Sequence, residues 1–123
     1  MEEWKSKLAQ WYRKELARYR KPAEAGNLEA QNSLAWIMAT CEESTVRDGT
    51  SAVAYAEKAV VKTNRKNPGY LDTLAAAYAE AGEFAKAIGA ESEAIALSKE
   101  EALRKRFSDR LKLYQSNTPY REP

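Results

Sequence analysis

The sequence predicts an all-α fold built from repeated helical hairpins, and three observations support this prediction. Apolar residues recur at helical spacing along nearly the whole chain of 123 residues. Capping residues, glycines and prolines separate these amphipathic segments. Residues 32–38 and 72–78 are imperfect copies of one another, as are residues 52–60 and 87–95. A hairpin that recurs along a chain stacks on its neighbours, because it cannot bury its apolar face alone.

The first helix is expected over about residues 2–21, with apolar side chains on one face and basic side chains mostly on the other. Pro22 should end or kink this helix. The apolar face consists of Trp4, Leu8, Trp11, Tyr12, Leu16 and Tyr19. Glu15 projects into the middle of that face, so we expect it to pair with Arg18 or another basic group.

The second and third helices are expected over about residues 27–40 and 50–63, with a polar loop between them. Asn27 is a suitable cap for the second helix, and it follows a glycine turn. Thr50 or Ser51 begins the third helix.

The last three helices have clear start and stop signals. Asn67 and Pro68 provide a cap and a first helical residue for the fourth helix, and Gly82 ends it. The fifth helix covers residues 84–98, and the sixth ends before residues 118–119. An apolar stripe marks the sixth helix, formed by Leu103, Phe107, Leu111 and Tyr114. The tail that follows is expected to be loosely held.

The hairpins define the organisation of a single domain. Ala52 and Ala87 occupy equivalent places 35 residues apart, whereas Leu34 and Leu74 are 40 apart, so the first hairpin has a connection five residues longer. Helical repeats accept such insertions in their loops. The predicted parts are an N-terminal helix (1–26), a first repeat (27–66), a second repeat (67–98), a C-terminal capping helix (99–116) and a tail (117–123).

Composition and charge limit the function classes. The net charge is +2, divided into basic ends and an acidic middle, which solvated helix faces explain. No apolar stretch is long enough for a secretion signal or a membrane span, so a cytoplasmic protein is expected. Cys41 is the single cysteine and there is no histidine, so neither a disulfide nor a zinc site nor another cofactor is predicted. Glu42 and Glu43 should raise the pKa of the Cys41 thiol.

The second repeat resembles the tetratricopeptide family, whose pattern has large residues on the first helix of a hairpin and alanines where the two helices meet. The matching residues are Leu71, Leu74, Ala75, Tyr78, Gly82, Phe84, Ala87 and Ala94. Residues 19–31 resemble the related Sel-like repeat. Leu71, Glu91 and Lys99 depart from the tetratricopeptide pattern, in which a tryptophan, an aromatic residue and a proline are usual, yet the packing pattern is kept.

The resemblance implies a right-handed superhelix in which two hairpins, flanked by capping helices, form a concave groove for a peptide or partner helix. The groove positions implied for this chain are Asn32, Trp36, Ala39, Asp72, Ala76, Ala79 and Glu80. Trp36 would be the aromatic anchor, while Asp72 and Glu80 would supply charge. Such a groove should prefer a basic or amphipathic segment of the partner.

Several of these residues also have purely structural interpretations. Trp36 could pack in the core under the first helix, because aromatic residues at helical spacing are often buried. Asp72 lies in the first turn of its helix, where the helix dipole favours a carboxylate. Gly89 inside the fifth helix suggests that another backbone passes close by.

Enzyme, nucleic-acid and membrane functions are not expected. The chain has no histidine, no glycine-rich phosphate loop and no nucleophile beside a recognisable base. Aromatic and basic residues of the first helix occupy opposite faces, so they would not contact one nucleic-acid strand together. Packing on the second helix is a simpler use of the aromatic face than membrane binding.

Two functions therefore remain open. In the first, the domain recruits another protein through its groove. In the second, it is a structural unit whose outer helices mediate self-association or dock onto a larger assembly.

Overall fold

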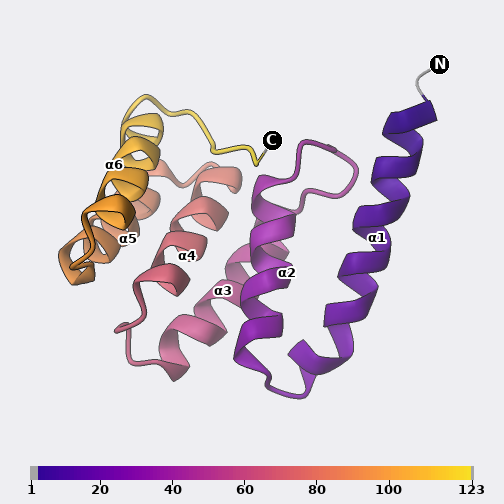
Figure 1. Cartoon of the computed structure of the whole chain (residues 1–123), viewed down its shortest axis with the longest axis horizontal. Coiled ribbons are helices and arrows are strands. Elements are labelled where there is room, and N and C mark those ends of the chain that lie inside the picture. Colours follow the sequence, from indigo (N-terminus) through magenta and orange to yellow (C-terminus); the bar gives the residue numbers. More distant parts are fainter. Residues whose placement is uncertain (1–2, 123) are drawn as a thin grey trace.

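Six helices make up the fold in the computed structural model, which describes residues 3–122 (Figure 1). They are α1 (Glu3–Glu24), α2 (Leu28–Thr40), α3 (Gly49–Lys62), α4 (Pro68–Glu80), α5 (Phe84–Leu97) and α6 (Glu101–Gln115). The all-α prediction is confirmed for this part of the chain. Its β-type pairing is limited to an isolated parallel bridge between Cys41 and Glu122.

Asparagine and aspartate side chains begin three of the helices. Asn27 accepts a hydrogen bond from the backbone of Ala30 at 2.9 Å, and Asn67 accepts one from Tyr70 at 3.1 Å. The cap of α3 is Asp48, whose side chain bonds the backbone N–H of Ser51. This helix therefore begins slightly earlier than the expected start at Thr50 or Ser51, because the carboxylate is an equally good cap.

The end of α1 differs from the expectation for Pro22. The helix includes Pro22 and continues to Glu24. The turn after it contains Gly26, which has φ +96° and therefore a left-handed conformation that favours glycine. The backbone of Asn27 closes the turn by bonding the Pro22 carbonyl at 2.9 Å. Proline is thus tolerated in the last turn, and glycine provides the stop.

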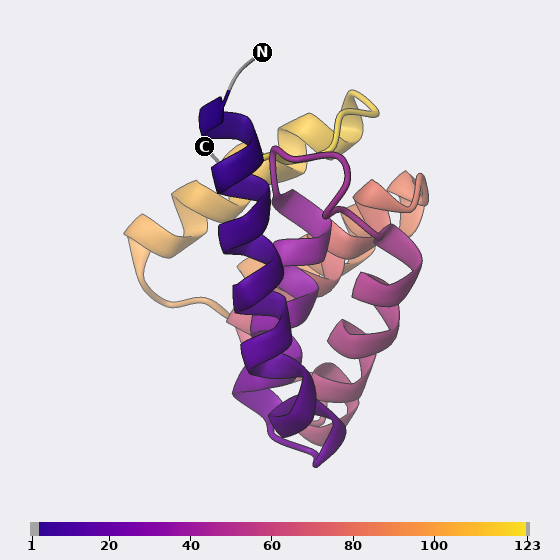
Figure 2. The ribbon, with the colours of Figure 1, turned by 90° about the vertical axis from the view of Figure 1, so that its right-hand side faces the viewer.

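Each helix packs against the next one in the chain, and α2 also packs against α4. In Figure 1, α2, α4 and α6 lie toward the viewer while α3 and α5 lie behind them. The view from the side shows α1 crossing one end of this stack (Figure 2). Leu34, Leu71 and Leu74 are almost fully buried at the centre. Alanines surround them, so the helices can approach closely.

The apolar face of α1 is only partly buried. Leu16 is in the core, but 53% of the Trp11 surface is exposed. Glu15 pairs with Arg18 at 3.6 Å, as expected. The side chain of Trp4 lies outside those that the structure describes. The first helix therefore leaves aromatic surface open along its contact with α2.

On α6, a charged residue occupies a place predicted for an apolar one. Arg110 is buried together with Phe107 and Tyr114, whereas Leu111 is only half-buried. The buried positions follow helical spacing, with Arg110 between Phe107 and Tyr114 where Leu111 was expected. A buried guanidinium requires a partner, and Asp72 of α4 provides it.

The inference drawn from Gly89 is wrong. No atom lies within 4 Å of the place where its Cβ would be, other than those of its own helix and neighbours. The close approach occurs instead at Gly49, whose Cβ would lie 2.8 Å from the backbone nitrogen of Ala81. The start of α3 therefore packs directly against the end of α4.

No helix in residues 3–122 combines the length and the apolar character needed to cross a membrane.

Candidate functional site

The chain places its own C-terminal tail on the face formed by α2, α4 and α6. After α6, the tail runs back over α4 and reaches the end of α2 (Figure 1). The backbone N–H of Glu122 donates a hydrogen bond of 2.8 Å to the carbonyl of Thr40. Residues 119–122 are half-buried. The expectation of a loosely held tail is therefore wrong for residues 119–122, which main-chain and side-chain contacts hold in place, while Pro123 lies outside the described residues.

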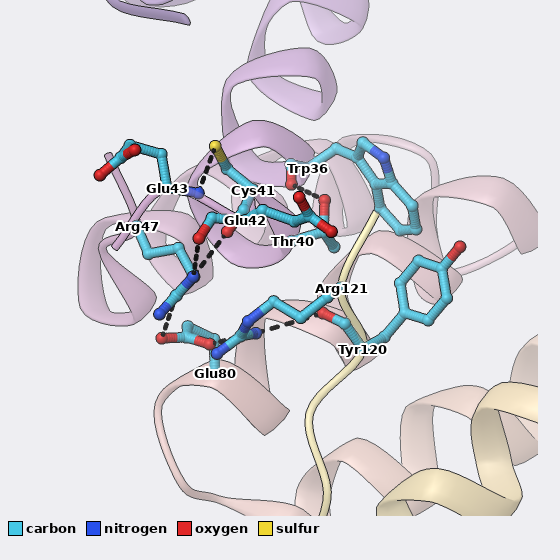
Figure 3. A network of polar contacts seen from close by, with 9 residues as sticks. All are labelled: Trp36, Thr40, Cys41, Glu42, Glu43, Arg47, Glu80, Tyr120 and Arg121. Atoms are coloured by element: carbon cyan, nitrogen blue, oxygen red, sulfur yellow. Dashed lines mark hydrogen bonds and ion pairs between the residues drawn. The ribbon is translucent and has the colours of Figure 1, made fainter. Parts of the chain in front are cut away.

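Tyr120 is the aromatic contact of the tail. Its ring centroid lies 5.7 Å from that of Trp36, and the two side chains adjoin in Figure 3. The guanidinium of Arg110 lies 4.5 Å from the Tyr120 ring centroid and 5.0 Å from that of Trp36. A cation over two aromatic faces is attracted by both ring quadrupoles. Tyr120 is thus held by one aromatic side chain and one cation of the helical face.

Arg121 is the charged contact of the tail. One of its nitrogens lies 2.7 Å from a carboxylate oxygen of Glu80, at the end of α4 (Figure 3). Arg47 approaches the other carboxylate oxygen of Glu80 at 3.4 Å. Arg47 also donates to the carbonyls of Cys41 and Glu42, so it anchors the long connection between α2 and α3. Glu80 therefore joins this loop, α4 and the tail.

A buried pair of acids, Asp72 and Glu91, holds Arg110 in place. It donates a hydrogen bond of 2.6 Å to Asp72, and both side chains are about nine-tenths buried. Glu91 of α5 is fully buried beside Asp72. Burial and the neighbouring Asp72 carboxylate raise the pKa of Glu91 to about 11, so it is a neutral acid that can donate a hydrogen bond to Asp72. The pair then carries one negative charge, which balances Arg110.

Two hollows border the tail. The first, about 380 Å³, lies between α2, α4 and α6, and the second, about 390 Å³, lies between α1 and α2. We call the second the α1–α2 hollow. Trp36 and Glu122 line both. A wider hollow of about 610 Å³ near Asn27 and Asn67 is not lined by the tail.

The predicted groove residues separate into two groups. Asn32, Trp36 and Asp72 come together at the hollow between α2, α4 and α6, and Glu80 contacts the tail. The three alanines expected in the groove are buried in the core, so they offer no open surface: Ala39, Ala76 and Ala79. Asp72 is also buried and is occupied by Arg110. Trp36 is half-buried and packs against the tail, not under α1 alone.

Reasoning from the sequence missed Arg110, Tyr120 and Arg121. A signal for the tail was present, because an aromatic and a basic residue follow Pro119 and complement Trp36 and Glu80. The role of Arg110 was hidden, because it lies beside the apolar residues of α6 and reads as solvent-exposed.

Cys41 is buried at the end of α2. Burial raises the pKa of its thiol, while the hydrogen bond that the thiol accepts from the Glu43 backbone N–H opposes this rise. Within the described residues, no three cysteine, histidine or acidic side chains are grouped as metal ligands would be. Comparison of the chain with protein families, characterised proteins and solved structures found no significant match.

Proposed function

We propose that this chain is a helical-repeat interaction domain whose face formed by α2, α4 and α6 binds an extended segment of a partner protein. The observation that carries the proposal is the tail itself. A stretch of four residues uses three kinds of contact on this face: a tilted aromatic contact with Trp36, an ion pair with Glu80 and a backbone hydrogen bond to Thr40. These contacts are typical of peptide recognition.

The geometry also supports a chemical preference. An aromatic side chain fits between Trp36 and Arg110, and a basic side chain fits next to Glu80. Asp72 contributes nothing to this preference, because Arg110 neutralises it. A preference for basic or amphipathic segments therefore depends on Glu80 and on the place for an aromatic ring between Trp36 and Arg110.

The proposed domain is of the tetratricopeptide kind, with α2 and α3 as one hairpin and α4 and α5 as the next in a right-handed superhelix. Two observations support this. α2 packs on α4 as well as on α3, and the alanines of the pattern, Ala75, Ala87 and Ala94, are fully buried. In this description α1 and α6 cap the two hairpins.

The proposal is tested by binding in trans. A full-length variant with Tyr120→Ala and Arg121→Ala loses the ring contact and the ion pair, so its tail should leave the face. We call this variant the released chain. A synthetic peptide of residues 116–123 should bind the released chain, as measured by isothermal titration calorimetry. The same peptide with Tyr120→Ala should bind at least about tenfold more weakly, because it loses an aromatic pair and a cation–π contact.

The control compares two half-buried aromatic residues. Trp36→Ala in the released chain should abolish peptide binding, whereas Tyr55→Ala on α3 should leave it unchanged, with circular dichroism confirming that both variants are folded. Failure of the peptide to bind the folded released chain would refute the proposal. A dimer of the intact chain that dissociates in the released chain would instead favour self-association by tail exchange.

A further inference from the structure

Two rows of side chains line the α1–α2 hollow, one row from each helix. Trp11, Glu15 and Tyr19 follow one another at intervals of four residues on α1, and Ser33 and Ile37 do so on α2. Residues spaced by four lie one above the other on the surface of a helix. The hollow therefore runs along both helices for about two turns, and a hollow of this shape accepts a third helix.

The charged part of this lining is acidic. Glu15 and Glu122 line the hollow, whereas none of the lysine or arginine side chains that the structure describes does. Most of the other lining is aromatic or aliphatic, and Trp11 at its edge keeps 53% of its surface exposed. A helix that fits the hollow should therefore bring a large apolar side chain flanked by basic ones.

The outer edge of α1, beside the hollow, has this same chemistry. Lys7, Trp11, Lys14 and Arg18 are three or four residues apart, so they form one row along the helix. All four side chains are exposed. We call Lys7, Lys14 and Arg18 the basic row. α1 is the outermost helix at one end of the stack, so a second molecule can reach this edge (Figure 2).

A surface that carries both a hollow and a helix edge that suits it can pair with itself. In a dimer with two-fold symmetry each contact occurs twice, so Trp11 of one copy enters the hollow of the other and the reverse. The basic row of each copy then lies next to the acids of the opposite hollow. Burial of two exposed indoles supplies the apolar contact of such an interface.

We infer that two copies of this chain associate through α1, with Trp11 of each copy in the α1–α2 hollow of the other and the basic row beside Glu15. This inference does not require that the face formed by α2, α4 and α6 binds a partner protein. It also differs from tail exchange, because the contacts of Tyr120 and Arg121 stay within one chain.

The first test removes the indole from the full-length chain. Sedimentation equilibrium should show a dimer of the wild type, and Trp11→Ala should weaken dimerisation at least about tenfold, as is usual for a tryptophan at the centre of an interface. The matched control is Val61→Ala on α3, because Val61 is also apolar and is 68% exposed. It should dimerise like the wild type, with circular dichroism confirming that both variants are folded.

The second test reverses charges on the two sides of the proposed contact. Glu15→Lys cancels the negative charge of the hollow, and Lys7→Glu with Lys14→Glu makes the helix edge acidic. Each variant alone should dimerise at least about tenfold more weakly than the wild type. An equimolar mixture should form a heterodimer, because the acidic hollow of the second variant meets the unchanged basic row of the first.

The control for net charge is Lys62→Glu with Lys66→Glu, which changes two exposed lysines away from α1 and should leave dimerisation unchanged. A monomeric wild type, a dimer that Trp11→Ala leaves unchanged, or the absence of a heterodimer in the mixture would overturn the inference. A dimer that dissociates in the released chain but persists in Trp11→Ala would establish tail exchange in its place. Peptide binding by the released chain is a separate readout, so the proposed function stands or falls independently.

Discussion

Glu91 is the residue whose environment departs most from what its chemistry prefers. It lies on α5 and is fully buried, and the charged groups near it are Asp72 of α4 and Arg110 of α6. The hydroxyl of Tyr114, also buried, faces the same cluster and has no hydrogen-bond partner among the described residues. One guanidinium cannot balance two buried carboxylates, so one acid stays protonated.

This protonation couples stability to pH. The unfolded chain releases the Glu91 proton above its ordinary pKa, whereas the folded chain keeps it until its pKa of about 11. Folding therefore takes up a proton between these two values, and stability falls as pH rises through that window. A single such group changes the free energy of unfolding by about 1 kcal/mol for each pH unit.

Replacing Glu91 by glutamine should remove this dependence. The amide of Glu91→Gln donates a hydrogen bond to Asp72 at any pH and carries no proton to lose. We expect urea denaturation to show that the free energy of unfolding of the variant changes little between pH 6 and 9, while that of the wild type falls. At pH 9 the variant should be more stable.

Glu100→Gln is the matched control, because Glu100 is exposed and its side chain makes no capping hydrogen bond. It should retain the wild-type slope. A wild-type stability that does not change between pH 6 and 9, or an equal slope in Glu91→Gln, would show that Glu91 is ionised in the fold.

At the scale of the helices, two glycines test how closely the elements pack. Gly49→Ala would place a methyl group 2.8 Å from the backbone of Ala81, which cannot move without shifting the end of α4. We expect a loss of stability of about 1–3 kcal/mol, typical of overpacking. Gly89→Ala meets no neighbour in the exposed middle of α5, so it should gain about 0.5–1 kcal/mol from helix propensity.

Urea denaturation of both variants at one pH gives the comparison. We expect the free energy of unfolding to fall for Gly49→Ala and to rise for Gly89→Ala, although both replace glycine by alanine. A gain in stability for Gly49→Ala would mean that α3 and α4 are further apart than the structure places them.

The helices themselves were predictable because their signals are local. Asn27 and Asn67 each act on a backbone group three residues away, so their effect can be seen in a short window of sequence. The tail was not predictable in this way. Tyr120 meets Trp36 and Arg121 meets Glu80, and such pairs depend on how α2, α4 and α6 stack.

The predicted groove shows the same division. The resemblance implied groove positions for Asn32, Trp36 and Asp72, and these three residues line one hollow. It could not show that Arg110 neutralises Asp72, because their positions are 38 residues apart. Nor could it show that the chain covers the same face with its own tail.

At the scale of the whole molecule, the tail makes this face self-occupied. A segment tethered by a short connection has an effective concentration of about 1 mM at its own site. If the free tail peptide bound the released chain with a dissociation constant of about 100 µM, the tethered tail would weaken peptide binding by the intact chain about tenfold. On the proposed function, a partner segment that binds this face must compete with the tail.

The most direct test of this account titrates a fluorescently labelled peptide of residues 116–123 with the intact chain and with the released chain, which carries Tyr120→Ala and Arg121→Ala. The account predicts that the released chain binds the peptide with the higher affinity. The expected factor is roughly the effective concentration of the tethered tail divided by the dissociation constant of the free peptide. Equal affinities of the two chains would contradict it, because the tail would then not occupy the site that the peptide uses.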